Sequence, residues 1–274
     1  MSEIAGRHVL ITGGASGIGR LMARQLAARG ARVTVWDINR DALDRVVAEL
    51  GGEARGIACD VSDREQVYAR AAESIAAAGP VDILINNAGI VSGADFLELP
   101  DAKIEATFDI NVLALFWTCK AFLPAMIARN RGHVVTIASA SGLIGVARLA
   151  DYSASKWAAV GFDESLRAEL RRTAPGVITT VVCPFYIDTG MFRGVKSRFP
   201  FLLPILKEDD AATRIVGAIA TNRRRLMMPW LCHFVPLLRV LPVRLFDWAA
   251  DFLGVNASMK DFVGRADHRD AAGR

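Results

Sequence analysis

The chain alternates short apolar runs with longer amphipathic segments, and this alternation predicts its architecture. Residues 7–12 and 32–36 are apolar, β-branched runs of strand length. Between them, residues 17–29 repeat apolar positions at helical spacing. The pattern therefore predicts a strand–helix–strand unit whose second strand is closed by Asp37.

The same alternation continues to residue 183. Buried parallel strands are continuous apolar runs rather than alternating ones, and the later strand candidates have that character. Strict alternation of strands and helices predicts an α/β fold, a doubly wound parallel sheet of the Rossmann type with helices on both faces. The further predicted helices are 40–50, 63–78, 102–129 and 152–172, and the further strands are a run ending at residue 59, 81–85, 133–138 and 177–183.

Regular alternation stops after Pro184. Residues 185–206 are apolar and contain prolines, and we expect them to form a substrate lid before a helix at 208–220. Residues 223–264 form a C-terminal extension that begins with a last sheet strand near 226–229. We predict one Rossmann-type domain over residues 1–264 and a loose tail over 265–274.

Composition narrows the class of protein. With 274 residues and 52% hydrophobic residues, the chain suits one large α/β domain. The net charge is +4, but the arginines are scattered over many predicted helices, which argues against nucleic-acid binding. The four cysteines are far apart and lack ligand spacing, so we expect no disulfide framework and no metal site. No signal peptide is visible, and we expect a cytoplasmic protein.

Residues 226–246 are apolar enough that we considered whether they span or contact a membrane. This stretch is apolar, but three prolines, Arg239 and Arg244 interrupt it, and a spanning helix needs about 20 mostly apolar residues. Arginines 223–225 and the apolar residues after them could instead rest on a membrane surface. We favour the plainer interpretation, in which the stretch covers the substrate pocket or a partner subunit.

A glycine-rich segment, TGGASGIG at residues 12–19, joins the first strand to the first helix. Gly13, Gly17 and Gly19 let the backbone approach a pyrophosphate, and the N–H groups at the helix start favour its negative charge. The spacing differs from the common G-x-G-x-x-G, so a glycine-rich turn without a ligand is the alternative.

Acidic residues follow the second and third predicted strands. Asp37 can accept hydrogen bonds from the adenosine ribose and would repel a 2′-phosphate, which favours NAD over NADP. Arg40 lies close enough to weaken that preference, although we interpret it as a solvated residue at a helix start. Asp60 and Val61 could bracket the adenine, or Asp60 could cap the next helix together with Ser62.

Further motifs follow in order along the chain. The full set is TGGASGIG (12–19), CDV (59–61), NNAG (86–89), Asn111, Ser139, YSASK (152–156) and CPFYIDTGMF (183–192). Taken together, these motifs resemble the short-chain dehydrogenase/reductase superfamily, in its subgroup of about 250 residues with a Y-x-x-x-K active site. The resemblance covers nearly the whole chain and implies catalytic residues Asn111, Ser139, Tyr152 and Lys156. The implied cofactor-binding residues are Gly13, Ser16, Gly17, Ile18, Gly19, Asp37, Asp60, Val61, Asn87, Ala88, Gly89, Tyr152, Lys156, Pro184, Ile187 and Thr189.

The proposed chemistry follows from Tyr152 and Lys156, which lie four residues apart and hence on one helix face. An ammonium about 4 Å from a phenol contributes about 4 kcal/mol at an effective dielectric near 20. This equals about 3 pK units and would bring the pKa of Tyr152 near neutrality. Tyr152 could then exchange a proton with an alcohol or carbonyl, while Ser139 hydrogen-bonds the same oxygen.

The resemblance also assigns individual roles. Lys156 would bind the nicotinamide ribose, and Asn111 would hold a water that links Lys156 to solvent; alternatively, Asn111 satisfies a backbone group. Ser139 rather than Ser141 stands thirteen residues before the tyrosine. Pro184, Ile187 and Thr189 would contact the nicotinamide carboxamide. This chain has Phe185 where the family usually has glycine, so we expect the adjoining substrate wall to differ.

Within the superfamily, residues 137–170, 188–192 and 202–206 resemble the branch of retinol dehydrogenases and 17-beta-hydroxysteroid dehydrogenases. We therefore expect NAD-dependent hydride transfer to or from a small hydrophobic alcohol or carbonyl. Alternatives are an NADPH-dependent carbonyl reductase and a non-catalytic dinucleotide-sensing protein. A homodimer or homotetramer is implied by the resemblance and by helices that are apolar on more than one face. The expected pocket residues are Leu143, Ile144, Val146, Leu149, Tyr186, Phe192 and the lid.

Overall fold

A computed structural model describes residues 4–264, and its centre is one seven-stranded parallel sheet. The strand order is β3-β2-β1-β4-β5-β6-β7, and every neighbouring pair is parallel. The predicted doubly wound α/β fold is therefore confirmed, while the predicted tail at 265–274 lies outside the described residues. The strands are β1 (His8–Thr12), β2 (Arg32–Asp37), β3 (Arg55–Ala58), β4 (Ile83–Asn86), β5 (Gly132–Ile137), β6 (Val177–Pro184) and β7 (Arg225–Met228).

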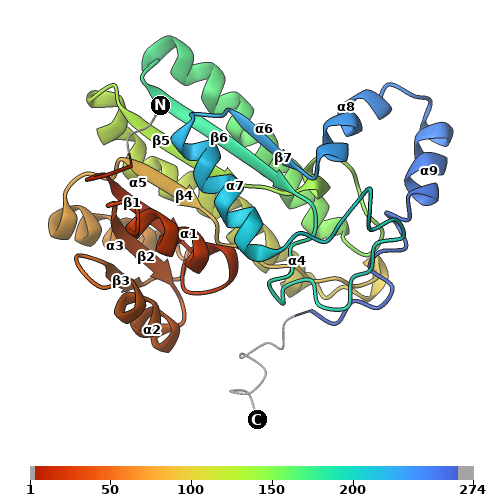
Figure 1. Ribbon diagram of the computed structural model, residues 1–274, viewed down its shortest axis with the longest axis horizontal. Coiled ribbons are helices and arrows are strands. Elements are labelled where there is room, and N and C mark those ends of the chain that lie inside the picture. Colours follow the sequence, from red (N-terminus) through yellow and green to blue (C-terminus); the bar gives the residue numbers. More distant parts are fainter. Residues whose placement is uncertain (1–3, 265–274) are drawn as a thin grey trace.

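Helices cover both faces of this sheet (Figure 1). Helices α1 (Gly17–Ala27), α2 (Arg40–Leu50) and α7 (Glu208–Ala220) bury apolar side chains against Val9 and Ile11 of β1. On the opposite face, α3 (Arg64–Ala78), α5 (Ala114–Ala128) and α6 (Ala150–Thr173) pack on Leu10. Successive side chains of β1 thus point to opposite faces of the sheet and pack in two different cores, because side chains alternate between the faces of a strand.

The predicted element bounds lie within about two residues of those observed, with one exception. The helix predicted at 102–129 is divided into α4 (Asp101–Phe108), a π-helical turn (Asp109–Leu113) and α5. Among the described helices, only this run is long and apolar enough to cross a membrane by length and composition. Its contacts with α3, α6 and β5 account for much of that apolar character.

The chain beyond β6 adds one strand and a small helical lobe. Residues 185–206 form turns and one isolated bridge, between Ile187 and Leu206, before α7 begins. Strand β7 confirms the strand predicted near 226–229. After it come the 3₁₀ helix η4 (Trp230–Phe234), α8 (Val235–Leu238) and α9 (Val243–Phe252), which we call the C-terminal lobe (residues 230–253). In Figure 1 this lobe projects from the end of the sheet at the right.

Candidate active site

The candidate residues converge on one edge of the sheet, because parallel strands present their carboxyl ends together. β1 and β4 are neighbours there although α1, β2, α2, β3 and α3 separate them in sequence. Such a switch in strand order opens a crevice in which doubly wound folds bind ligands. The predicted cofactor-binding residues follow β1, β2, β3, β4 and β6, and the predicted catalytic Ser139 follows β5.

The glycine turn between β1 and α1 has no room for side chains. Gly13 has a φ of +61°, and a Cβ there would lie 2.8 Å from the Cα of Ala88. A Cβ on Gly19 would lie 2.3 Å from the carbonyl oxygen of Gly13. Helix α1 begins at Gly17 without an acidic residue in its first turn, so its N-terminus can accept an anion. The predicted Ser16, Gly17 and Ile18 lie at this helix start.

Asn87 supports the glycine turn from the neighbouring strand. Its side-chain nitrogen donates to the carbonyl oxygens of Thr12 and Gly13, at 3.0 and 2.9 Å. In return, the Thr12 hydroxyl accepts from the backbone N–H groups of Asn87 and Ala88. Asn87 therefore holds the turn that would meet a pyrophosphate. Thr12 belongs to the same arrangement but was not predicted as a site residue. Its place as the first residue of the glycine motif could have indicated this role.

Asp37 stands at the end of β2, beside the glycine turn. One carboxylate oxygen accepts from the backbone N–H of Ala15 at 3.1 Å, and the other accepts from Asn39 at the same distance. Arg40 is exposed and is the first residue of α2. The carboxylate thus lies where an adenosine ribose would meet the turn.

Asp60 follows β3, and its side chain accepts from both the backbone N–H and the hydroxyl of Ser62, at 3.0 and 2.6 Å. The N-cap of α3 is instead Asp63, which accepts from Glu65 and Gln66. The interpretation of Asp60 as a helix cap is therefore wrong. Val61 is buried in the core beneath this turn.

Ser139 and Tyr152 meet under the end of β5. The Ser139 hydroxyl accepts from the Ser141 N–H at 3.1 Å and donates to the Pro184 carbonyl at 3.4 Å. Burial raises the pKa of Tyr152 well above its usual value, and a hydrogen bond with Ser139 opposes that rise only in part. Both side chains are buried, so the hydroxyl pair lies in a low-dielectric environment.

Lys156 lies one helical turn after Tyr152 on α6. Its ammonium donates to the Ile137 carbonyl at 3.0 Å and lies 5.5 Å from the centre of the Tyr152 ring. Burial lowers the pKa of Lys156 to about 8. The expectation that Lys156 brings the pKa of Tyr152 near neutrality is therefore wrong for this state. Desolvation by burial is the largest influence on the pKa of both groups, since each is buried away from water.

Asn111 projects from the π-helical turn towards the chain that follows β4. It accepts from the Ile90 N–H at 2.9 Å and donates to the Ile90 carbonyl and the Ser155 hydroxyl, both at 3.0 Å. These bonds match the alternative in which Asn111 satisfies a backbone group, and the water relay stays a prediction. A Cβ on Gly89 would lie 3.2 Å from Asn111 Oδ1 and 3.5 Å from Lys156 Nζ, so that glycine backbone fits between them. Ser155, a further partner that the sequence analysis did not single out, stands inside the YSASK motif, which was the available signal.

Aromatic side chains after β6 cover Tyr152. The Phe192 ring meets the Tyr152 ring edge to face at 5.8 Å, and Tyr186 packs on Phe192 at 5.0 Å. The Tyr186 hydroxyl is fixed by Ser258 at 2.8 Å. Pro184 ends β6, and the predicted Ile187 and Thr189 follow in the next turn. Residues 185–206 thus close the site from one side.

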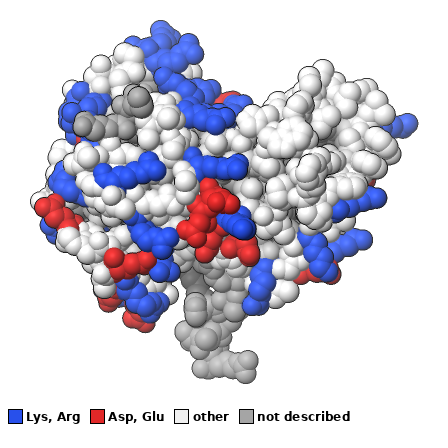
Figure 2. Space-filling view, viewed as in Figure 1, with Lys and Arg blue, Asp and Glu red and all other residues white. Residues whose placement is uncertain are grey.

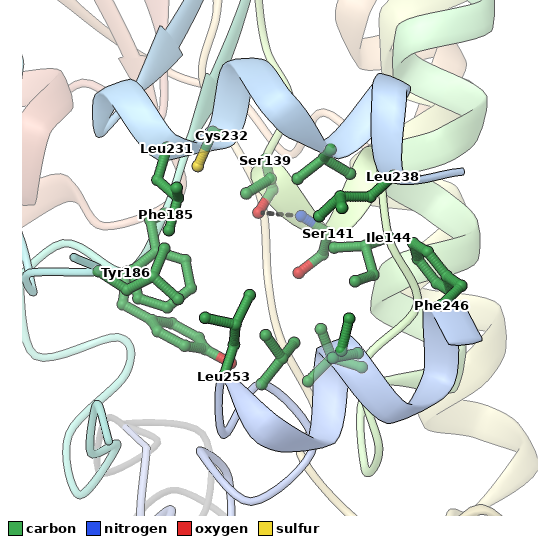
Figure 3. A pocket seen from close by; sticks show the side chains of 17 residues that line it. Ser139, Ser141, Ile144, Phe185, Tyr186, Leu231, Cys232, Leu238, Phe246 and Leu253 are labelled. Atoms are coloured by element: carbon green, nitrogen blue, oxygen red, sulfur yellow. Dashed lines mark hydrogen bonds between the residues drawn. The ribbon is translucent and has the colours of Figure 1, made fainter. Parts of the chain in front are cut away.

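An apolar cavity of about 70 Å³ adjoins Ser139 (Figure 3). The predicted Ile144, Val146 and Tyr186 line it. Leu143, Leu149 and Phe192 are not among the lining residues, although Leu149 and Phe192 pack in the same apolar cluster as Val146 and Tyr186. Leu143 packs in a neighbouring cluster. Most of the remaining wall comes from η4, α8 and α9, which agrees with the interpretation that residues 226–246 cover the pocket, and it continues beyond that range to Val255. The other lining residues are Ala140, Ser141, Phe185, Leu203, Leu231, Cys232, Val235, Leu238, Phe246, Ala249, Ala250, Leu253 and Val255.

Comparison with known proteins decides the family. The family model described as short chain dehydrogenase matches residues 7–198. The chain belongs to the short-chain dehydrogenase family. It is 47% identical to epidermal retinol dehydrogenase 2 of Mus musculus, over 96% of this chain and 87% of that protein. It is 42% identical to estradiol 17-beta-dehydrogenase 11 of Macaca fascicularis, over 88% of this chain and 81% of that protein.

Solved structures of short-chain dehydrogenases share the fold. A Burkholderia phymatum enzyme in complex with NAD superposes with a TM-score of 0.79 at 30% identity, covering 88% of this chain and 95% of that one. A metagenomic short-chain oxidoreductase in complex with NADP gives a TM-score of 0.69 at 33% identity, covering 83% and 98%. Each of these matches covers more than four fifths of this chain, so the sheet that carries the candidate residues has the fold of the solved short-chain dehydrogenases.

Proposed function

We propose that this short-chain dehydrogenase transfers hydride between NAD and an apolar alcohol or its carbonyl product, with Tyr152 as general acid and base. The observation that carries the proposal is that Ser139, which lines an apolar cavity, meets Tyr152 and Lys156 after β5, and that only β4 separates β5 from β1 and its glycine turn. The names of the retinol and estradiol relatives support a retinoid, steroid or other lipid-like substrate.

The residues fit a nicotinamide dinucleotide. Backbone at Gly13 and Gly19 leaves no room for a Cβ, which suits close approach by a pyrophosphate at the start of α1. Asp37 provides a carboxylate for the ribose hydroxyls and would repel a 2′-phosphate, which favours NAD. When bound, the cofactor supplies the acceptor or donor of hydride.

The protein's side chains transfer the proton that accompanies the hydride. In alcohol oxidation the C–H bond breaks with its electron pair leaving as hydride, and Tyr152 takes the hydroxyl proton. In carbonyl reduction Tyr152 returns that proton to the oxygen. Ser139 hydrogen-bonds the same oxygen and stabilises charge that develops on it. The Lys156 ammonium, close to the Tyr152 ring, stabilises the phenolate form that oxidation requires.

Replacing Tyr152 with phenylalanine tests the assignment. We expect turnover of retinol, hydroxysteroids or long-chain alcohols to fall by about 10²–10⁴-fold, because general acid–base catalysis contributes that much. Binding of NADH, followed by its fluorescence, should be unchanged. Tyr68→Phe on exposed α3 is the control and should keep full activity. Unchanged turnover in Tyr152→Phe would contradict the role, and NADH binding without any turnover in the unaltered protein would favour a dinucleotide sensor.

A second candidate function is an NADPH-dependent carbonyl reductase. The raised pKa of Tyr152 favours it, since a protonated phenol is ready to donate to a carbonyl oxygen. Titration with NADH and NADPH, and with NAD⁺ and NADP⁺, separates the two candidates. Tighter binding of the phosphorylated forms would favour the reductase.

We further propose a homodimer or homotetramer built through α5 and α6. Their exposed surface includes Phe116, Ile127 and Trp157, which a second copy would cover. A cytoplasmic location is proposed as well, supported by four free cysteines that are all buried.

A further inference from the structure

The outer surface of the C-terminal lobe is apolar. Val240 is 81% exposed and Trp248 is 64% exposed, and several other large apolar side chains of the lobe are exposed with them. In Figure 2 the lobe, at the upper right, is almost free of charged side chains, with arginine or lysine along its edge. A continuous apolar patch of this kind marks an interaction site.

Helix α9 separates this outer surface from the cavity wall. At 100° per residue its side chains fall into three rows, of which two are apolar. One row lines the cavity, the next is exposed and apolar, and the third is polar. In that order the rows are Phe246, Ala249, Ala250 and Leu253; Leu245, Trp248 and Phe252; and Arg244, Asp247 and Asp251. More than half of the circumference is therefore apolar, from the cavity to the outer surface.

The exposed row continues into an aromatic cluster with a cation at its edge. The Trp248 ring stacks on the Phe252 ring at 5.6 Å, and Phe252 meets Phe199 at 5.6 Å. The Arg198 guanidinium lies 5.3 Å from the Phe199 ring and 5.6 Å from the Phe252 ring. Tryptophan beside arginine is typical of the boundary between lipid headgroups and acyl chains, where indoles sit and arginines reach phosphates.

The cavity is too small for the substrates proposed above. It has about 70 Å³, whereas a pocket for a drug-sized ligand holds about 300–1,000 Å³. A ligand of that size needs a wider opening, and a separation of η4 and α8 from α9 would provide one by exposing Leu231, Leu238 and Leu253, which line the cavity. In water this exposure is unfavourable, but against acyl chains it is not.

We propose that the outer surface of the C-terminal lobe docks on a lipid bilayer and that the apolar substrate enters from that bilayer between α8 and α9. The exposed row of α9 would lie at the headgroup boundary, and Arg198 and Arg244 would face lipid phosphates. This proposal rests on the proposed function for the identity of the substrate. The run of arginines at 223–225 contributes less than the sequence analysis suggested, because Arg225 forms an ion pair with Glu164.

A bilayer explains this surface better than a second copy does. The exposed row of α9 offers carbon atoms and one indole N–H, whereas specific protein interfaces carry about one hydrogen bond per 100–200 Å². A second copy seated there would also block the route into the cavity. The proposed contact between copies uses α5 and α6 instead and does not include the exposed row of α9, although Arg239 of the lobe lies over the Trp157 ring of α6 at 4.5 Å.

Vesicle flotation of the full chain tests docking directly. The probes are phosphatidylcholine vesicles and phosphatidylcholine vesicles with added phosphatidylserine. We expect the unaltered protein to float with both and more strongly with the anionic ones. The double variant Leu245→Asp, Trp248→Asp should float at least about tenfold less, because two exposed apolar anchors are lost. Tyr68→Asp, an equivalent change on α3 at the other end of the sheet, should float like the unaltered protein.

Two readouts keep docking separate from the proposed function. NADH binding and turnover of a short, water-soluble alcohol are measured on the same preparations. Turnover without flotation overturns docking and leaves the function standing, whereas flotation without turnover supports docking and counts against the function. Equal flotation of the double variant overturns the proposal. A second result also overturns it. If the unaltered protein does not float but forms an oligomer, and the double variant loses that oligomer, then the patch joins two copies of the chain instead.

Discussion

Asp37 combines two tasks in one carboxylate. Its hydrogen bond to the Ala15 N–H fixes the glycine turn from β2, and its charge sits where a dinucleotide ribose would arrive. A neutral side chain could fill the first task in part, but only a carboxylate both accepts from two ribose hydroxyls and repels a phosphate.

We expect Asp37→Ala to weaken NAD⁺ binding by about ten- to a hundredfold, because a hydrogen bond to a charged group contributes about 1.5–3 kcal/mol. Binding of NADP⁺ should be unchanged or stronger, since the repelling charge is gone. Dissociation constants for both cofactors, measured by calorimetry, check this. Asp41→Ala, an exposed carboxylate in the first turn of α2, is the control. An unchanged ratio of the two constants would show that Asp37 does not select the cofactor.

The residues of the candidate site could be predicted from sequence because each motif has a fixed spacing and a fixed place at the end of a strand. The ionisation state of Tyr152 could not be predicted in this way. The four-residue spacing places Lys156 on the same helix face, but it does not reveal that both groups are buried or that Ile137 binds the ammonium. A pKa depends on those surroundings more than on the partner alone.

At the scale of elements, α6 carries buried charge beyond the catalytic pair. Asp163 faces β6, where Thr179 donates to it at 3.4 Å, and Arg167 lies 3.9 Å away on the same helix. Its second carboxylate oxygen is buried without a partner. Burial raises the pKa of Asp163 to about 6, and Arg167 and Thr179 oppose that rise only in part.

We expect Asp163 by itself to lower the free energy of unfolding as pH rises from about 4 to about 6, while buried His133, whose pKa burial lowers to about 4, acts in the opposite direction over the same window. In that window the folded state keeps the Asp163 proton that the unfolded state has lost, so folding binds a proton and weakens with rising pH. A shift of about 2 units corresponds to about 3 kcal/mol, an upper figure for one group. Asp163→Asn should remove this dependence and be more stable at pH 7. Urea unfolding at pH 4.5 and 7 measures it, with Glu169→Gln as the exposed control. Equal pH dependence in Asp163→Asn would contradict the assignment.

Elements with strong periodicity could be placed from sequence to within about two residues. The π-helical turn at Asp109–Leu113 could not, because its side-chain partner, Ile90, is distant in the chain. The short helices of the C-terminal lobe were not predicted either, although residues 226–246 were expected to cover the pocket or a partner subunit. Helix α8 has four residues and α9 has ten, and prolines precede or begin both, so a helical period has little length in which to show.

At the scale of the whole molecule, two exposed apolar surfaces among residues 4–264 bear on its partners. One is the lobe, and the other runs along α5 and α6, where the Phe116 ring packs on Phe162 at 4.8 Å and remains 42% exposed. The two surfaces belong to different elements, so they can serve different partners. We assign the lobe to a bilayer and the helical surface to a second copy of the chain.

We expect Phe116→Asp to convert the homo-oligomer into a monomer of 29.6 kDa, because a carboxylate at the centre of an apolar contact remains without a partner. Light scattering on a sizing column measures the mass. Tyr68→Asp, outside the contact, should retain the mass of the unaltered protein. An unaltered protein that is already monomeric, or a variant of unchanged mass, would show that this surface does not join copies.

The cavity wall has a consequence for how such an enzyme can diversify. The family match ends at residue 198 and contains the glycine turn, Ser139, Tyr152 and Lys156, whereas most of the wall comes from residues 203–255. Redox chemistry and choice of substrate are therefore encoded in successive stretches of the gene. Mutation in the later stretch can produce a new substrate range without disturbing the inherited reaction.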